Sequence, residues 1–154
     1  MEVVEFKSLV EDVVAKAMKL KDDYTDQKTA KVNYSAIFSH NPGEYAALVE
    51  VANEIGKVID DTPTGPLFHI EALDTCAGQL KLVKVRKPDE TRKERGDADF
   101  TVSDYDSFKR TYLPRPGFRL ITRSKMEMIE LTAPGFDVRA YFSNPPLDLQ
   151  FAIK

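Results

Sequence analysis

The sequence predicts an α+β fold: two tandem β-α-β-β-β units forming a curved mixed sheet with helices on one face, preceded by an N-terminal amphipathic helix. Three observations lead to this prediction. The chain has 154 residues, 42% of them hydrophobic, which suits a single compact domain with its own core. Apolar residues recur at three- and four-residue steps in some segments and at alternate positions in others. These segments follow a similar order in the two halves of the chain.

The first segment, residues 3–20, has the pattern of an amphipathic helix. Its apolar residues, among them Phe6, Val10 and Val13, are separated by charged residues at helical spacing. The periodicity is lost after Leu20, so we expect an N-terminal helical region within residues 1–24. A helix in this place could cover an exposed sheet or pack against its copy in a second chain.

The first β-α-β-β(-β) unit is expected over residues 31–87. Alternation of apolar and polar residues begins at Lys31, and Asn41-Pro42-Gly43 breaks it. Helical spacing follows, and then a segment whose composition is typical of a turn. The expected elements are a strand from Lys31, a helix over residues 44–59, a turn over residues 60–66, and strands over residues 67–73 and 80–87.

A charged connector, residues 88–96, separates this unit from the second unit, residues 97–143. Eight of the eleven residues from 87 to 97 are charged, four of each sign, which is typical of a solvated surface segment. Residues 144–154 form a tail that could complete the sheet as a strand. The elements expected in the second unit are a strand over residues 97–103, a helix over residues 104–113, and strands over residues 118–123, 126–131 and 137–143.

Charge and cysteine content exclude several classes of function. The net charge of −3 offers no positive excess for a phosphate backbone or an anionic membrane surface. The single cysteine, Cys76, cannot form an internal disulfide. Glu2 and Glu5 stand where a signal peptide carries Lys or Arg, and no stretch approaches the roughly 18 apolar residues of a membrane span. We therefore expect a cytoplasmic protein that binds neither nucleic acid nor a membrane.

The second half also resembles a known family. Residues 97–108, Asp-Ala-Asp-Phe-Thr-Val-Ser-Asp-Tyr-Asp-Ser-Phe, are similar to the common opening strand and helix of the vicinal oxygen chelate superfamily, the glyoxalase, bleomycin-resistance and extradiol-dioxygenase group. Gly117-Phe118 and residues 133–138 are similar to its later loop and final hairpin. The resemblance covers about residues 31–143 and implies tandem β-α-β-β-β units.

The resemblance further implies a divalent metal, held by His or Glu side chains from the first and last strands of each unit. In the second unit these positions fall on Asp97 and near Ala140. In the first unit the opening strand offers only Asn33 or Ser35. The implied ligand set is therefore incomplete, although the implied fold does not depend on it.

Period-two alternation predicts that polar side chains gather on one face of the sheet, which becomes a cleft if the sheet curls. The residues expected to pack under the helices are Tyr34, Ala36, Phe38, Phe68, Ile70, Phe100 and Val102. The ligand-binding residues expected on the opposite face are Asn33, Ser35, Asp97, Asp99, Thr101, Arg139 and Tyr141, together with His69 and Glu71.

The candidate catalytic residues on this face are His69 and Glu71, which lie two apart on one expected strand. They could act as a general acid and base, or join Asp97 in holding a divalent metal, which is the cofactor that the sequence leaves open. The alternative is a structural or solvated histidine. Asp97 and Asp99 place like charges close together, which would raise the pKa of at least one of the two carboxyls if water is excluded. The alternative is that the two carboxylates pair with nearby cations at the sheet edge.

These observations favour a small-molecule-binding protein, of glyoxalase-like lyase or isomerase type, that uses the polar cleft. No glycine-rich phosphate loop and no nucleophile motif occurs in the sequence. The alternative is a non-catalytic dimeric binding or interaction module. In that case the N-terminal helix and the two half-sheets would form the association surface of a homodimer.

Overall fold

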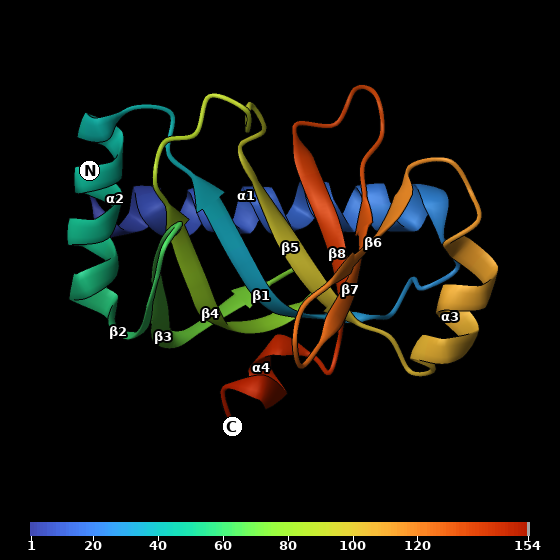
Figure 1. Cartoon of the computed structure of the whole chain (residues 1–154). Coiled ribbons are helices and arrows are strands. Elements are labelled where there is room, and N and C mark those ends of the chain that lie inside the picture. The colour runs from blue at the N-terminus through green and yellow to red at the C-terminus, as the bar shows by residue number, and fades with distance from the viewer. Residues whose placement is uncertain (154) are drawn as a thin grey trace.

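The computed structural model describes residues 1–153 and contains one eight-stranded sheet with the strand order β2-β3-β4-β1-β5-β8-β7-β6 (Figure 1). β1 and β5 meet antiparallel at the centre of the sheet. The strands are β1 (Lys31–Phe38), β2 (Gly56–Thr62), β3 (Gly65–Thr75), β4 (Gly78–Arg86), β5 (Gly96–Thr101), β6 (Phe118–Thr122), β7 (Glu127–Leu131) and β8 (Val138–Asn144). The helices are α1 (Val3–Tyr24), α2 (Pro42–Ile55), α3 (Tyr105–Tyr112) and α4 (Leu147–Gln150).

The two halves of the chain have the same organisation. The first runs β1-α2-β2-β3-β4 and the second β5-α3-β6-β7-β8. In each half the first strand pairs parallel with the last one, β1 with β4 and β5 with β8. The predicted α+β fold of two tandem β-α-β-β-β units after an N-terminal helix is therefore confirmed.

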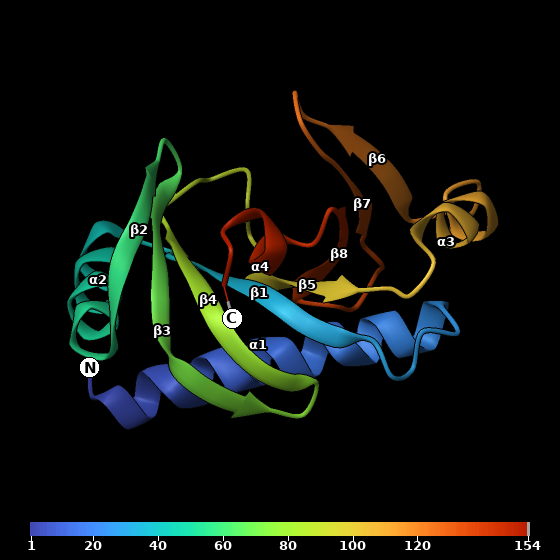
Figure 2. The same cartoon turned by 90° about the horizontal axis from the view of Figure 1, so that it is seen from below.

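Helix α1 covers one face of the sheet. Its apolar residues Phe6, Val10, Val13, Val14, Ala17 and Leu20 are all 0% exposed. Figure 2 shows α1 along the convex side of the sheet, whereas the edge strands β2 and β6 rise on the other side and α4 lies between them. We call this other, concave side the open face. Because its apolar stripe is buried against its own sheet, α1 covers the sheet, which is one of the two roles expected for it, and only its outer face is open to a second chain.

Helix α2 ends earlier than the apolar periodicity of the sequence predicts. The side chain of Asn41 caps the first turn by accepting a hydrogen bond from the Glu44 backbone N–H, and the helix ends at Ile55. Residues 56–62, expected to be helix end and turn, form the edge strand β2 instead. At Gly56 a Cβ atom would lie 2.4 Å from the carbonyl oxygen of His69, so only glycine allows β2 to pair so closely with β3.

A bulge in β1 changes which residues face the helices. The register with β5 shifts after Val32, so that Val32 pairs with Phe100 but Tyr34 pairs with Asp99. The additional residue reverses the alternation that follows it. The expected placement of Tyr34, Ala36 and Phe38 under the helices is therefore wrong, because they lie on the open face. Ser35, expected on the polar face, pairs with Ala98 and lies on the helix side.

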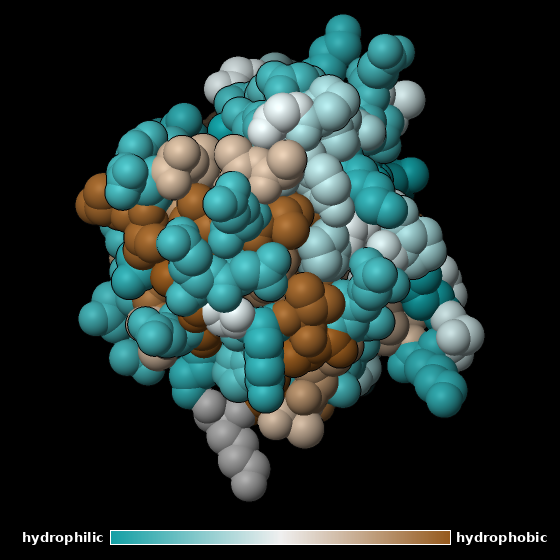
Figure 3. Space-filling view, turned by 90° about the vertical axis from the view of Figure 1, so that its left-hand side faces the viewer, coloured by the Kyte–Doolittle hydropathy of each residue, from teal (hydrophilic) through white to brown (hydrophobic). Residues whose placement is uncertain are grey.

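The surface around α2 carries scattered apolar residues. Figure 3 shows that hydrophobic side chains on this side are interrupted by hydrophilic ones. The large apolar residues most exposed in this region are Met1, Val4 and Val58. Within residues 1–153, no helix combines the length and the apolar character that crossing a bilayer requires.

Candidate functional site

A cavity of about 340 Å³ lies on the open face of the sheet. Both units contribute to it, as do the connector between them and the C-terminal segment. Its charged lining residues are Lys84, Arg86, Arg92, Asp97, Asp99 and Arg123. Its apolar lining residues are Leu67, Ile121, Met128, Leu147 and Phe151.

Strand alternation brings the charged residues to this face. On β4, Lys84 and Arg86 alternate with the core residues Val83 and Val85. On β5, Asp97 and Asp99 flank Ala98, which belongs to the core. In each strand the apolar residues turn toward the buried core on the helix side while the charged ones turn toward the cavity.

Asp99 is buried and fully hydrogen bonded. Its Oδ1 accepts hydrogen bonds from the Asn33 side-chain amide at 3.1 Å and from the Ser143 backbone N–H at 3.2 Å. The Ser143 hydroxyl donates to Oδ2. Burial raises the pKa of this carboxyl to about 6, although these hydrogen bonds favour its charged form. Asp99 therefore joins β1, β5 and β8 below the cavity and has a structural role.

Asp97 differs from Asp99 because it has an unused oxygen. Its side chain is 6% exposed, and its Oδ1 has no hydrogen-bond partner among residues 1–153. Burial, followed by the charge of Asp99, raises the pKa of Asp97 to about 7, while the charge of Arg86 opposes this rise. The carboxyl thus changes its protonation state near neutral pH and can accept or give a proton inside the cavity.

Cationic side chains surround this carboxyl. The guanidinium groups of Arg86 and Arg92 lie 5.5 and 5.9 Å from the centre of the Phe38 ring. The Nε of Arg86 is buried without a hydrogen-bond partner in the described chain. Burial lowers the pKa of Lys84 from its ordinary value. These three cations, with one carboxylate already satisfied and the other titrating near neutrality, make the cavity attractive to an anion.

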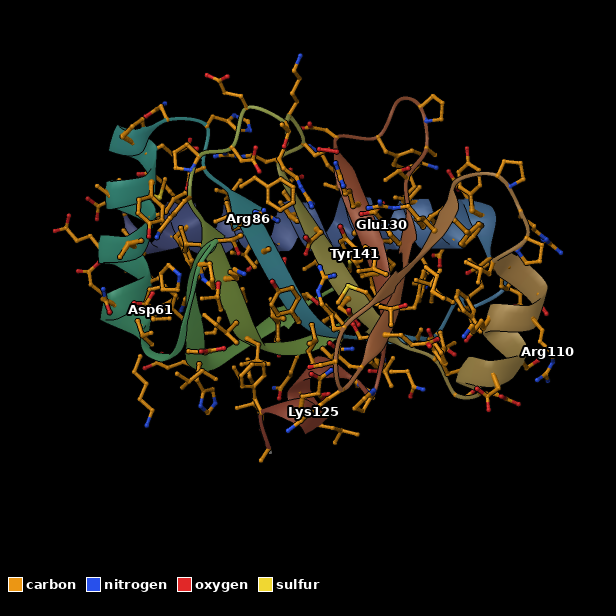
Figure 4. All side chains as sticks on the ribbon, in the orientation of Figure 1. Asp61, Arg86, Arg110, Lys125, Glu130 and Tyr141 are labelled. Atoms are coloured by element: carbon orange, nitrogen blue, oxygen red, sulfur yellow. The ribbon has the colours of Figure 1, made fainter. Side chains whose placement is uncertain are left out.

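Tyr141 is fixed beside the cavity by an ion-pair network. Its hydroxyl donates to Glu130 Oε2 at 2.7 Å, and Arg139 Nη1 donates to the same oxygen at 3.1 Å. Arg139 also makes two hydrogen bonds to Glu94, at 2.7 and 3.3 Å. Figure 4 shows Arg86, Tyr141 and Glu130 over the open face and Arg110 at the periphery. Arg139 is thus committed to protein carboxylates and positions Tyr141 through Glu130.

Comparison with known proteins identifies a solved structure that has the same fold as this chain. No protein-family model and no curated protein matches the chain. The chain shares its fold with protein EC4020. This structural-genomics protein is 12% identical to the chain, and the alignment covers 90% of this chain and 85% of that one with a TM-score of 0.69. At this identity the likeness concerns the fold alone.

Two other solved structures align more loosely. One is a glyoxalase/bleomycin resistance protein/dioxygenase superfamily member from Vibrio splendidus 12B01, at 10% identity, with 75% and 98% of the two chains covered and a TM-score of 0.44. The other is methylmalonyl-CoA epimerase from Mycobacterium tuberculosis, at 14% identity, with 73% and 86% covered and a TM-score of 0.41. One of these neighbours is named as a member of the superfamily that the sequence resembles, but at TM-scores below 0.5 neither alignment supports a statement about the family, the fold or the site of this chain.

The structure brings some of the expected site residues together and separates others. Asp97, Asp99 and Tyr141 line the cavity, whereas Arg139 does not line it and instead bonds to Glu130, which holds the Tyr141 hydroxyl. Asn33 donates to Asp99 and, at 2.9 Å, to Thr101 Oγ1, so both residues belong to the structural network. Ser35, on the helix side, donates to the backbone oxygen of Asp97 at 2.8 Å and does not reach the cavity.

His69 and Glu71 do not converge with Asp97. His69 pairs with Lys57 on β2 and with Leu82 on β4, and the register of β3 becomes irregular after it. Neither His69 nor the exposed Glu71 lines the cavity. In the part of the chain that the structure describes, no group of three His, Cys, Asp or Glu side chains could hold a metal ion. The residues present therefore do not fit the metal centre considered for His69, Glu71 and Asp97.

Several lining residues were not expected from the sequence. Lys84 and Arg86 had a usable signal, because they alternate with two buried valines on one strand. Arg92 belongs to the charged connector, which was expected to be only a solvated surface. Leu147 and Phe151 lie in and just after α4, where the sequence allowed a terminal strand.

Proposed function

We propose that the protein binds a small anionic molecule in the cavity on the open face. The observation that carries this proposal is a pair of buried polar atoms without hydrogen-bond partners in the described chain, the donor Arg86 Nε and the acceptor Asp97 Oδ1. Both residues line the same cavity. A buried polar atom without a partner costs about 1–3 kcal/mol, so a ligand that satisfies both atoms gains that energy on binding.

The charges of the cavity support an anion. Lys84, Arg86 and Arg92 line it together, and guanidinium groups match the geometry of carboxylate and phosphate oxygens. Arg92 is held toward the cavity by its 3.5 Å hydrogen bond to the Tyr141 hydroxyl. Partial burial of these side chains weakens the competition from water and salt.

The proposal includes a chemical role for Asp97, which fits the lyase or isomerase class. A general acid or base works best when its pKa lies near the working pH, and the pKa of Asp97 is about 7. Asp97 would take a proton from the bound molecule and return it. Because the described residues do not fit a metal centre, the proposal assigns no step to a metal.

Replacing Arg86 by methionine should weaken anion binding about 10- to 100-fold, because the substitution removes one charge-assisted hydrogen bond in a buried place. The measurement is a calorimetric titration of the full chain with inorganic phosphate and with 2-hydroxybutyrate. Arg110→Met is the matched control, because Arg110 is exposed on α3 and lines no part of the cavity. Absence of binding to the unmodified protein, or an equal loss in the control, would contradict the proposal.

A further inference from the structure

We infer that the ligand of this cavity is a short-chain carboxylate that carries a hydroxyl group next to the carboxylate and an apolar tail in contact with the C-terminal segment. This inference rests on the proposed function and specifies the class of ligand. It combines the two unpartnered polar atoms with the apolar half of the cavity lining. Neither feature alone distinguishes such a molecule from a simple anion.

The polar end of the ligand is inferred from the two unpartnered atoms, Arg86 Nε and Asp97 Oδ1. A carboxylate accepts hydrogen bonds from Arg86 and Lys84, but it offers no donor to Asp97 Oδ1. A neighbouring hydroxyl supplies that donor when Asp97 is charged and accepts from Asp97 when it is protonated. An ammonium group in the same place would add a further positive charge to a cavity already lined by Lys84, Arg86, Arg92 and Arg123. The hydroxyl is therefore the better complement.

The apolar end follows from side chains that belong to separate elements. Leu67 comes from β3, Ile121 from β6 and Met128 from β7, and all three turn toward the cavity on the open face. An inorganic anion would leave these side chains in contact with water. The volume of about 340 Å³ has room for on the order of ten non-hydrogen atoms, which a hydroxycarboxylate of moderate length supplies.

The C-terminal segment completes the apolar wall. Leu147 and Phe151 line the cavity, whereas Leu149 between them is 66% exposed. The segment lies over the concave side of the sheet (Figure 2). The Gln150 side-chain amide donates to the backbone oxygen of Pro145 at 2.7 Å, which holds this turn of helix together. Because Phe151 is not part of the buried core cluster, it can be changed without removing a core residue.

The test is a titration of the full chain with 2-hydroxycarboxylates of increasing length, from glycolate to 2-hydroxyoctanoate. Heteronuclear NMR spectra monitor the binding. Affinity should rise by up to about fourfold for each buried methylene group. Phe151→Ala should reduce this dependence on chain length, lowering the affinity for 2-hydroxyoctanoate by a larger factor than the affinity for glycolate. Leu149→Ala, the matched control in the same C-terminal segment, should keep the full dependence. Hexanoate should bind at least tenfold more weakly than 2-hydroxyhexanoate.

The outcomes separate this inference from the proposed function. If glycolate and phosphate bind but affinity does not depend on chain length, the apolar tail is refuted and anion binding stands. If hexanoate binds as well as 2-hydroxyhexanoate, the assignment of the hydroxyl is refuted. If none of these anions binds, both the inference and the proposed function are overturned. Thermal unfolding of each variant shows that it is folded before its affinities are compared.

Discussion

Replacing Asp97 by asparagine should raise the free energy of unfolding by on the order of 3 kcal/mol at pH 8. In the folded protein the pKa of this carboxyl is about 7, against an ordinary value of 3.8. The folded state therefore binds the proton more tightly than the unfolded state. The stabilisation from protonation is fully present below about pH 4 and is lost as the pH rises toward 7. Asparagine has a similar shape but carries no charge at any of these values.

Urea denaturation at pH 5 and pH 8 measures this effect. The unmodified protein should lose stability between the two values, and Asp97→Asn should lose much less. A smaller loss should remain in the variant, because the pKa of Asp99 is also raised, to about 6. Asp61→Asn is the control, since Asp61 is exposed on β2. If Asp97→Asn shows the full pH dependence of the unmodified protein, the origin assigned to it here is wrong.

The same substitution should impair function. A buried carboxyl that destabilises the folded protein at neutral pH is typical of sites where activity and stability compete. Asparagine can still hydrogen bond to a ligand, but it cannot accept and return a proton. A more stable protein that binds anions without turning them over would agree with the acid-base role proposed for Asp97.

Deleting residues 1–24 should leave the chain unfolded. The deletion removes six apolar side chains of α1 that are 0% exposed, and it uncovers the sheet residues beneath them. Burial of each such side chain contributes about 1.5–3 kcal/mol, except for the smaller alanine, and the sum rivals the whole stability of a typical domain, about 5–15 kcal/mol. Circular dichroism and urea denaturation of the truncated chain provide the measurement. Cooperative unfolding of that chain would show that α1 is dispensable.

A point substitution tests the same helix more finely. Phe6→Ala should lower the free energy of unfolding by about 3–5 kcal/mol, because it leaves a cavity under α1. Val4→Ala is the matched control on the same helix. Val4 is 72% exposed, so its substitution should change stability by no more than about 0.5 kcal/mol. Equal effects of the two substitutions would contradict the packing of α1 described above.

The parts of the fold that the sequence predicts are those with an uninterrupted period. Helix α1 and strand β5 each keep one spacing throughout, so their buried faces follow directly from it. The bulge at Asn33 could not be foreseen, because the hydrogen bonds that Asn33 makes there go to Asp99 and Thr101, two residues more than sixty positions away. The same holds for β2, whose residues continue a helical spacing but gain more from pairing with β3.

The site was predicted in part for the same reason. Asp97, Asp99 and Tyr141 follow from alternation in β5 and β8, but Arg92 and Phe151 come from segments with no period at all. The expected meeting of His69 and Glu71 with Asp97 was wrong for a different reason. Two residues that lie side by side on one strand need not approach a third residue on another strand. The family resemblance implied a metal ligand at Asp97, where the structure places a carboxyl among cations.

The antiparallel pairing of β1 with β5 has a further consequence. The cavity spans this seam, with Lys84 and Arg86 supplied by the first unit and Asp97 and Tyr141 by the second. In the proposed function, the cations of the first unit would attract the ligand and Asp97 of the second unit would exchange the proton, so the two halves would have separate tasks. Substitutions of Lys84 or Arg86 should therefore change ligand capture, whereas substitutions of Asp97 should change the chemistry, so that protein engineering can adjust the two separately.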